Sequence, residues 1–461
     1  MHSDGASSQR AAPGRDALLC IAQSFAPKTT PTAIRASKLL ERLSTQWDVT
    51  VITEVPRARV DERMHVEVVG GRRPRRLFAA LRRLRLNKLI ELFVWPDDSI
   101  FWVVPAVLAA RRLVRQRAPE AIVVFMMPYS AGLVGVLLGR LTGLPLILNL
   151  DDSLTCTDMQ PYFPTRLHYR LARGLEDLYL RRADAVIYVS QTNLDAVKAR
   201  APEHLRDKLA LVRYGADPTE FQPRESPPDR VEVAYVGAMS GWWALIGDQA
   251  PAGRLKRLYT AWTRLGRYQR TVLDHRTSSP AIAGKAILEL LAEHPSWRER
   301  VRLIVYGNPY DPSVVARALA RTGIEEVVTV LDPVPHAEVA GIIASADLLF
   351  ITLPMRVDGS PGGRISAKTY EYLMTDRPIL AAVPRGENWT YLADKPGVWL
   401  VEPDDQQAMK QVIAQISEAK LAGAPLVFDR QPLRAELSYD IRAQELASVI
   451  RAGIARRRRS S

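Results

Sequence analysis

Residues 353–384, LPMRVDGSPGGRISAKTYEYLMTDRPILAAVP, decide the fold that we predict for this chain. An apolar strand at 348–353 leads into a glycine-rich loop, a helix is predicted over 366–374, and a second buried strand follows at 379–383. A strand, such a loop and a helix N-terminus together form a natural anion site. The reason is that free backbone N–H groups and the positive end of the helix dipole point to one place.

The side chains of this segment suit a phosphorylated ligand. Gly362, Gly363 and Arg364 precede the predicted helix, and we expect their backbone N–H groups to be donors. Lys368 adds a positive charge, and Glu371 can accept hydrogen bonds from a diol. A phosphate with an attached ribose fits this arrangement. A glycine-rich loop before a helix often only turns the chain, so both interpretations stay open for this stretch alone.

The pattern S-x-K-x-x-E-Y-L-x-x-x-R-P-I-L at 366–380 resembles the nucleotide-sugar motif of retaining GT-B glycosyltransferases, of the glycogen-synthase and bacterial mannosyltransferase type. In that family a Glu-x7-Glu pair lies here. The resemblance implies that Glu371, the second Glu, holds the donor ribose. The first Glu falls at Gly363, which has no carboxylate. In the family the first Glu contacts the sugar. In this chain the backbone N–H groups of 362–364 or Asp358 could make that contact instead.

Length and composition indicate a globular protein of two or three domains. The chain has 461 residues, 47% of them hydrophobic and 25% charged, which is typical of a soluble protein. Cys20 and Cys156 cannot make a disulfide framework, which favours a reducing compartment. We expect residues 1–16 to be a disordered leader and no secretory signal. The uncharged run 121–139 is predicted as a strand, a turn and a helix, not a membrane span.

The charge distribution predicts acidic partners. The net charge is +13, and residues 71–90 contain eight basic residues and no acid. Leu77, Leu81 and Leu84 follow helical spacing, which indicates a basic amphipathic helix. Either this helix contacts an anionic membrane surface, or its leucines lie in the core. We predict no nucleic-acid partner, because no recognition motif accompanies the charge. Arginines at 456–459 are expected in a basic tail, 456–461.

Alternating strands and helices predict an α/β protein with two doubly wound, Rossmann-like domains and ligand in the cleft between them. We expect an acceptor-side domain at 17–220, completed by a C-terminal helix at 437–455, and a donor-binding domain at 230–430. The GxGxxG motif is absent, so no dinucleotide cofactor is predicted. An insert at 241–279 interleaves aromatic and basic residues. We expect a lid over the donor site, although its aromatic residues could also pack or meet a lipid or nucleic acid.

Two polar segments of the first half are expected to face the cleft. Asp151 and Asp152 follow the predicted strand 144–150, at the strand end where such folds bind ligands. They could act as a base or stabilise charge at the anomeric carbon, or they could only cap a helix. Thr30, Pro31 and Thr32 stand where the family has a PxxGG loop, which implies an acceptor-side loop.

Two further segments resemble family motifs. Residues 176–190 match E-x6-A-D-x-V-I-x-V-S, and Gly215, Asp217 and Phe221 match a G-x-D-x-x-x-F pattern at the crossing into the second domain. We expect a positive φ at Gly215.

In the second domain, Gly237 after the strand 231–236 opens the donor side. Lys285 is the best match for the family's donor-phosphate lysine, and Arg276 is the second.

The resemblance implies retaining transfer of a sugar from a nucleoside-diphosphate sugar to a saccharide or lipid-linked saccharide, without a metal. It further implies surface-polysaccharide assembly at the cytoplasmic membrane face. Two alternatives are a sugar-nucleotide epimerase of the same fold and a non-catalytic binding or scaffold protein. The predicted site residues are Asp151 and Asp152 as catalytic groups, Gly237, Lys285, Gly362, Gly363, Arg364, Lys368 and Glu371 for the donor, and Thr30, Pro31 and Thr32 for the acceptor.

Overall fold

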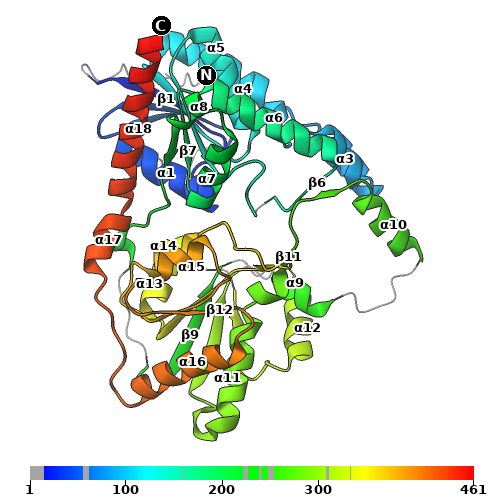
Figure 1. Cartoon of the computed structure of the whole chain (residues 1–461), viewed down its shortest axis with the longest axis vertical. Coiled ribbons are helices and arrows are strands. Elements are labelled where there is room, and N and C mark those ends of the chain that lie inside the picture. Colours follow the sequence, from blue (N-terminus) through cyan, green and yellow to red (C-terminus); the bar gives the residue numbers. More distant parts are fainter. Residues whose placement is uncertain are drawn as a thin grey trace, which may run out of the picture.

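The computed structural model of the chain forms two lobes, each a parallel sheet with helices on both faces (Figure 1). This confirms the predicted pair of Rossmann-like domains. The described residues are 15–55, 62–158, 160–221, 227–237, 241–247, 254–307, 311–332 and 334–460. The predicted leader therefore lies almost entirely outside them.

The first lobe is built on seven parallel strands in the order β3-β2-β1-β4-β5-β7-β8. Its central strands are uninterrupted apolar runs, because a parallel strand is covered on both faces. All five residues of β4 are buried, for example, and Leu18 lies opposite Ala121. The strands are β1 Ala17–Ala22, β2 Asp48–Thr53, β3 Met64–Val68, β4 Ala121–Phe125, β5 Leu146–Asp151, β7 Ala185–Tyr188 and β8 Leu209–Leu211.

Helices cover the two faces of this sheet in separate layers. One face carries a core formed with α4, α5 and α6, and the other carries a core formed with α1 and α18. The bounds are α1 Pro31–Leu43, α2 Arg75–Arg83, α3 Asn87–Phe93, α4 Ile100–Arg117, α5 Ser130–Thr142, α6 Arg166–Arg182, α7 Gln191–Arg200 and α8 Glu203–Arg206.

The second lobe has six parallel strands in the order β13-β12-β9-β14-β16-β17. Its elements are β9 Val231–Val236, α9 Gly241–Ile246, α11 Ala281–Glu293, β12 Val301–Tyr306, α12 Pro312–Thr322, β13 Val328–Leu331, α13 His336–Ser345, β14 Leu348–Thr352, α14 Ala367–Tyr372, β16 Ile379–Ala382, α15 Glu387–Leu392, β17 Val398–Val401, α16 Gln406–Leu421 and α17 Gln431–Leu437.

The last helix, α18 (Tyr439–Ser460), returns to the first lobe, where Leu446 and Ile450 are fully buried. The arginines of the predicted basic tail, 456–461, form the last turns of this helix, which continues to Ser460. Arg456 donates hydrogen bonds to the carbonyl oxygens of Asp184 and Asp207, so the helix end is fixed to the body of the lobe.

The predicted insert divides into two parts. Helix α9 belongs to the second-lobe core, where Trp242 is 1% exposed. Residues 254–274, which we call the bridging segment, extend across to the first lobe. They contain α10 (Arg254–Arg264), β10 (Tyr268–Gln269) and β11 (Leu273–Asp274).

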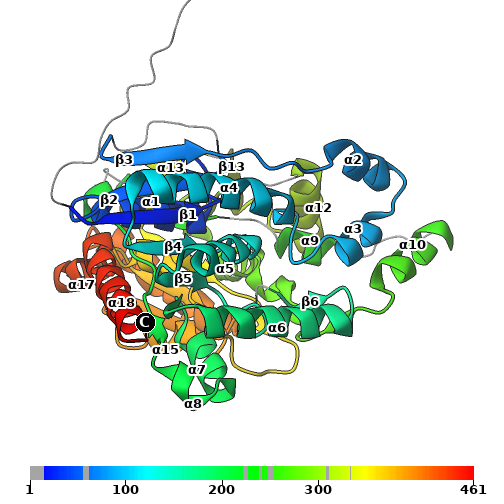
Figure 2. The ribbon, with the colours of Figure 1, turned by 90° about the horizontal axis from the view of Figure 1, so that it is seen from above.

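The bridging segment touches both lobes. Helix α10 contacts α3, and β10 pairs with β6 (Tyr162–Phe163) of the first lobe. Strand β11 pairs with β15 (Met355–Arg356) of the second lobe. Helices α2, α3 and α10 project together from one end of the molecule (Figure 2). The described part of the predicted lid is therefore a connection between the lobes.

The run 121–139 forms β4 and the greater part of α5, as predicted. Within the described ranges, no helix is both long and apolar enough to span a bilayer.

Candidate active site

A lysine and a glycine meet at the carboxyl end of β9. Gly237 has φ of +139°, and a Cβ placed on it would lie 2.2 Å from Cε of Lys368. The Lys368 Nζ is 3.1 Å from the hydroxyl of Tyr235 and 4.2 Å from the centre of its ring. The structure thus brings together Gly237 and Lys368, two of the residues predicted for the donor side. The absence of a side chain at 237 makes room for the ammonium group.

Arg364 lies where the two lobes face each other. Burial lowers the pKa of its guanidinium, while the negative charges of Asp158 and Asp152 act in the opposite direction. Both carboxylates belong to the first lobe, whereas Arg364 belongs to the second. This arginine is therefore a cation held between lobes.

Asp152 is the carboxylate of the predicted pair that faces this arginine. Burial, followed by the charge of Asp151, raises the pKa of Asp152 to about 6, although Arg364 opposes the shift. Its Oδ1 accepts a 2.9 Å hydrogen bond from the side-chain amide of Asn193. Asp152 can thus change its charge close to neutral pH.

Asp151 has a different environment from its neighbour. Its Oδ1 accepts hydrogen bonds from Arg35 at 2.9 Å and Asn149 at 2.7 Å, and its Oδ2 accepts one from Tyr214 at 3.3 Å. The side chains of Arg35 and Asp151 are only 1% and 5% exposed. Asp151 also has φ of +59°. This carboxylate holds α1 against the end of β5, which is a structural role, and a catalytic role for it stays a prediction.

The glycine-rich loop is not the open anion site that we predicted. The N–H of Gly362 donates to the carbonyl oxygen of Arg385 at 2.8 Å, and the N–H of Gly363 donates to Asp158 at 3.1 Å. The prediction that these two groups are free for a ligand is therefore wrong in this conformation. Helix α14 also begins later and ends earlier than predicted, at Ala367 and Tyr372.

Asp158 is the residue that sequence reasoning missed. Its Oδ1 accepts hydrogen bonds from Arg356 at 3.0 and 2.7 Å, so one first-lobe carboxylate binds the arginine and the Gly363 N–H of the second lobe. Beside it lies a cavity of about 10 Å³, lined by Asp158, Arg364 and Asn388 among others. Such a volume holds about one water molecule.

Glu371 is partly exposed and is not sealed in a core. Burial is the main cause of the raised pKa of Tyr439, and the charge of Glu371 adds to it. Tyr439 begins α18, which packs on the first lobe. The Glu371 carboxylate therefore lies toward the region between the lobes.

The phosphate-binding candidates outside the loop are dispersed. Lys285 is exposed on the second turn of α11, and its side chain forms no hydrogen bond or ion pair with the described residues. Arg276 is exposed and pairs with Asp274 at 2.6 Å. The neighbouring His275 lies close to Arg364, whose charge, after burial, lowers the pKa of the imidazole. No interaction between Lys285 and Lys368 is found among the described residues, whereas His275 lies near Arg364.

Asp358, the expected substitute for the missing Glu, is exposed and accepts hydrogen bonds from the N–H and hydroxyl of Ser360.

On the acceptor side, Thr30 is the N-cap of α1 and accepts from the N–H of Ala33 at 3.4 Å. Pro31 is the first helical residue, Thr30 and Pro31 are exposed, and Thr32 is partly exposed. They form the start of a helix at the carboxyl edge of the first sheet.

The motif residue Glu176 is structural. It is fully buried and accepts from the N–H of Leu154 at 3.3 Å and the hydroxyl of Thr155 at 3.0 Å, so it fixes the chain just after Asp152. The expected positive φ at Gly215 is wrong. A Cβ there would lie 2.9 Å from the carbonyl oxygen of Leu437, so close approach of the chain explains this glycine.

Two family models match the chain. The model described as glycosyl transferase 4-like domain matches residues 32–215, and the model described as glycosyl transferases group 1 matches residues 279–419. Each match falls on one of the two lobes.

Relatives agree with this result. The probable glycosyltransferase WbjE of Pseudomonas aeruginosa is 29% identical over 61% of this chain and 62% of its own length. Alpha-maltose-1-phosphate synthase of Mycolicibacterium smegmatis is 31% identical over 26% of this chain and 31% of its own length. The chain thus matches from about a third to about three-fifths of these relatives.

Solved structures share the fold. HepE from Anabaena, in complex with UDP-glucose, aligns with a TM-score of 0.60 at 16% identity, over 94% of this chain and 98% of HepE. Sucrose-phosphate synthase from Thermosynechococcus elongatus aligns with a TM-score of 0.59 at 15% identity, over 95% and 98% of the two chains. The chain belongs to the GT-B glycosyltransferases, with a glycosyl transferase 4-like domain followed by a group 1 domain.

Proposed function

We propose that the protein transfers a sugar, with retention, from a nucleoside-diphosphate sugar to a hydroxyl of a saccharide or lipid-linked saccharide. The observation that carries this proposal is the position of two cations, Lys368 beside Gly237 and Arg364 between the lobes, opposite Asp152. The named ligand of HepE and the family membership support a nucleotide sugar as donor.

These residues fit the charges of such a reaction. The bond from the anomeric carbon to the diphosphate oxygen breaks, and Lys368 and Arg364 neutralise the departing diphosphate. Fixed cations of this kind stabilise the transition state, because they need no reorganisation when charge develops. The acceptor oxygen bonds to the anomeric carbon and gives its proton to the departing phosphate. Ionised Asp152 stabilises the positive charge on the sugar, and Glu371 holds the ribose.

Donor entry requires the lobes to separate. The cavity between them, about 10 Å³, is far smaller than the roughly 300–1,000 Å³ of ordinary ligand sites. Opening breaks the Gly363–Asp158 hydrogen bond and frees the N–H group that the sequence predicted as a donor. Closure then excludes water as a competing acceptor.

Donor turnover tests the site. Nucleotide binding is first measured as a thermal shift with UDP-, GDP-, ADP- and dTDP-sugars, because a ligand that binds the native state raises its stability. Lys368→Ala and Glu371→Ala should each reduce turnover at least about 100-fold. Lys410→Ala and Glu293→Ala, which break an ion pair elsewhere on the second lobe, are the matched controls. Unchanged turnover in both site variants would remove the assignment.

A binding-only protein remains the second candidate. Gly363 replaces the family's first Glu, and its N–H is engaged with Asp158, which favours this alternative. Nucleotide-induced stabilisation without turnover across the donor and acceptor panel would establish it. Our scheme uses protein cations only, so turnover should be insensitive to EDTA. Loss of turnover with EDTA and recovery with Mg²⁺ would contradict it.

Contact with an anionic membrane surface is the second part of this proposal. On α2 it is Phe78 that is buried, while Leu77 and the C-cap residue Leu84 are 56% and 68% exposed. Leu77 and Leu84 are therefore exposed among arginines, while Leu81 is partly buried. We propose that this surface meets lipid, which would place the protein at the cytoplasmic face of a membrane, where polysaccharide acceptors are assembled.

Vesicle sedimentation tests this membrane contact. The wild type should bind vesicles of phosphatidylcholine with phosphatidylglycerol more tightly than vesicles of phosphatidylcholine alone, and salt should weaken the binding. Leu77→Glu with Leu84→Glu should abolish it. Val427→Glu, at an exposed position of the second lobe, is the control. Equal binding of all variants would exclude the surface.

A further inference from the structure

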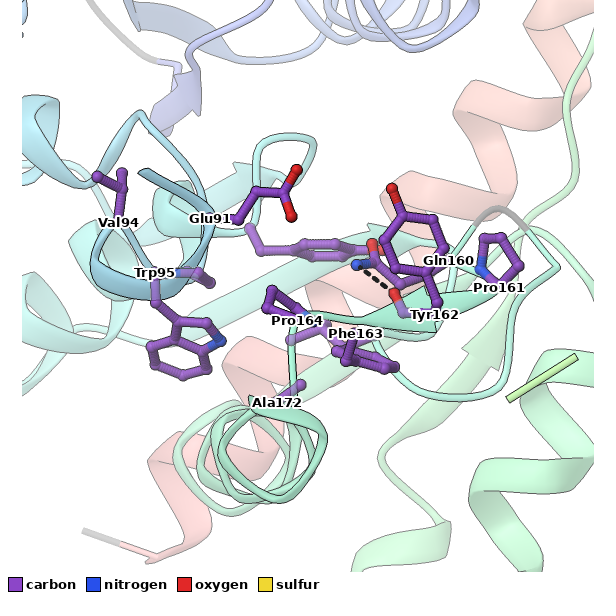
Figure 3. A pocket seen from close by; sticks show the side chains of 12 residues that line it. Glu91, Val94, Trp95, Gln160, Pro161, Tyr162, Phe163, Pro164 and Ala172 are labelled. Atoms are coloured by element: carbon purple, nitrogen blue, oxygen red, sulfur yellow. Dashed lines mark hydrogen bonds between the residues drawn. The ribbon is translucent and has the colours of Figure 1, made fainter. Parts of the chain in front are cut away.

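A pocket of about 370 Å³ lies in the first lobe, and neither Lys368 nor Glu371 is among its lining residues. Glu91 and Trp95 approach it from the α3 side, Gln160 and Tyr162 approach from the opposite side, and Phe163 lies between them (Figure 3). Its size is at the lower end of the range for small-molecule sites. Tyr129 and three prolines, Pro96, Pro161 and Pro164, also line it.

We infer that this pocket binds a sugar ring of the acceptor, and that the bridging segment of the second lobe forms its outer support. This inference rests on the proposed glycosyl transfer. A sugar ring has apolar C–H faces and a rim of hydroxyl groups. Aromatic and proline side chains offer flat apolar surfaces for the faces. The carboxylate of Glu91 accepts hydrogen bonds from hydroxyl groups, and the amide of Gln160 both donates and accepts.

One lining residue of the pocket lies close enough to Asp152 to be affected by its charge. Tyr129 lines the pocket, and the charge of Asp152, after burial, contributes to the raised pKa of Tyr129. Gln160 follows Asp158 by two residues, and Asp158 binds Arg356 and the Gly363 N–H of the second lobe. A sugar in the pocket would thus lie on the first-lobe side of Asp152, opposite the cations.

The bridging segment fixes one wall of the pocket. Its strand β10 pairs with Tyr162 and Phe163, and the carbonyl oxygen of Pro161 accepts from the N–H groups of Arg270 at 2.9 Å and Thr271 at 3.2 Å.

Two aromatic contacts add to this attachment. The guanidinium of Arg267 lies 4.1 Å from the centre of the Tyr162 ring, and Tyr268 packs on Tyr169 with ring centres 4.7 Å apart. Selection of the acceptor therefore depends on residues from both lobes.

The surface beside the α3 side of the pocket suits an acceptor on a lipid carrier. Glu91 and Val94 lie at the end of α3, next to Phe93, which is 82% exposed. Helix α10 beside it exposes Leu255 (79%) and Leu258 (63%). A sugar in the pocket would leave its apolar anchor on this surface.

Saturation-transfer NMR tests the pocket directly. The probes are methyl and octyl glycosides of glucose, galactose, mannose and N-acetylglucosamine. We expect saturation of ring protons for at least one sugar with the wild type, and at least about a tenfold loss with Trp95→Ala and Glu91→Gln, because the contacts of a buried ring are removed. Arg267→Ala should weaken the ring-proton saturation, because Arg267 supports Tyr162 in the pocket wall. Trp243→Ala, which removes an exposed tryptophan on α9 of the second lobe, should keep it.

Three results would overturn the inference: no ring saturation with any glycoside, saturation of the octyl chain alone, or full saturation in Trp95→Ala and Glu91→Gln. The thermal shift with nucleoside diphosphates is measured on the same variants and should be unchanged, which controls for folding. If no nucleotide stabilises any variant while ring saturation behaves as expected, the donor proposal fails and the saccharide pocket stands.

Discussion

The carboxylate of Glu387, at the start of α15 in the second lobe, accepts a 2.7 Å hydrogen bond from the backbone N–H of Gln191, at the start of α7 in the first lobe. The same carboxylate accepts from the N–H of Thr192 at 3.1 Å and from Arg213 at 2.8 Å. It therefore caps a helix of the opposite lobe, where the helix dipole favours an anion. This contact keeps the two lobes together in the conformation described here.

Glu387→Gln should loosen this contact between the lobes. Although burial opposes it, the hydrogen bonds from Ser190, Arg213 and the α7 N–H groups lower the pKa of Glu387. The stability that ionised Glu387 contributes is therefore fully present above the ordinary carboxyl pKa. It is lost as the pH falls through the lowered pKa of Glu387. We expect a larger radius of gyration by small-angle X-ray scattering for the variant at about pH 7.5. Glu402→Gln, which affects a pair within the second lobe, is the control. Identical scattering of variant and wild type would exclude the role.

Asp152→Asn should stabilise the protein near neutral pH. The pKa of Asp152 is raised to about 6, so its charged form costs stability above that pH, and the cost disappears below the ordinary carboxyl pKa. We expect the free energy of unfolding to rise by up to about 3 kcal/mol at about pH 8 and to change little at about pH 4. Denaturation in urea measures both, with exposed Asp404→Asn as control. An equal gain at the two pH values would contradict this account.

Turnover should depend on the ionisation of the same group. If ionised Asp152 stabilises charge on the sugar, the rate should fall as the pH drops through about 6. Asp152→Asn should be at least about 100-fold slower and should lack this acidic limb. If Asp152→Asn keeps the wild-type pH–rate profile, another residue must stabilise the charge on the sugar.

Gly237→Ala should disturb the donor side specifically. The new Cβ would lie 2.2 Å from Cε and 2.5 Å from Nζ of Lys368, and the φ of +139° disfavours any side chain. We expect a loss of about 1–3 kcal/mol in stability together with a weaker nucleotide-induced thermal shift. Gly70→Ala is the matched control, since a Cβ there meets nothing within 4 Å. Full nucleotide binding by Gly237→Ala would show that nucleotide binding does not require Lys368 to lie beside residue 237.

Arg35→Met should be among the most destabilising changes in the first lobe. It removes the partner of buried Asp151, and an unpaired buried charge costs about 3–5 kcal/mol. Adding Asp151→Asn should recover part of this loss, because asparagine carries no charge. Asparagine also tolerates the left-handed backbone conformation at 151. Unfolding in urea measures the single and double variants. Equal stability of the two would mean that the charge of Asp151 is not the cause.

The sequence predicted what depends on strand order and local period. Gly237 and Lys368 meet because each lies close to the carboxyl end of a neighbouring parallel strand, β9 or β14, which is the edge where ligands bind in such sheets. The apolar run 121–139 was assigned to a strand and a helix because a proline and glycines interrupt it.

The sequence could not predict contacts between loops of different lobes. Asp158 and Arg356 are almost 200 positions apart and belong to no periodic pattern, yet they form the charged contact beside Arg364. Nothing local separates Asp151 from Asp152 either. Arg35, on a helix packed against the sheet, binds Asp151 and gives it a structural role. Asp152 has no such partner on α1 and lies at the interface between the lobes.

Helix α18 has a consequence for biosynthesis. Tyr439, Leu446 and Ile450 fill the core under β1, although some 420 residues separate them from that strand. On the ribosome, the amino-terminal half would emerge with one apolar face of its sheet covered only in part, by α1, until α18 has been translated. Premature termination before Tyr439 should therefore yield an aggregating chain even though every donor-side residue has been made.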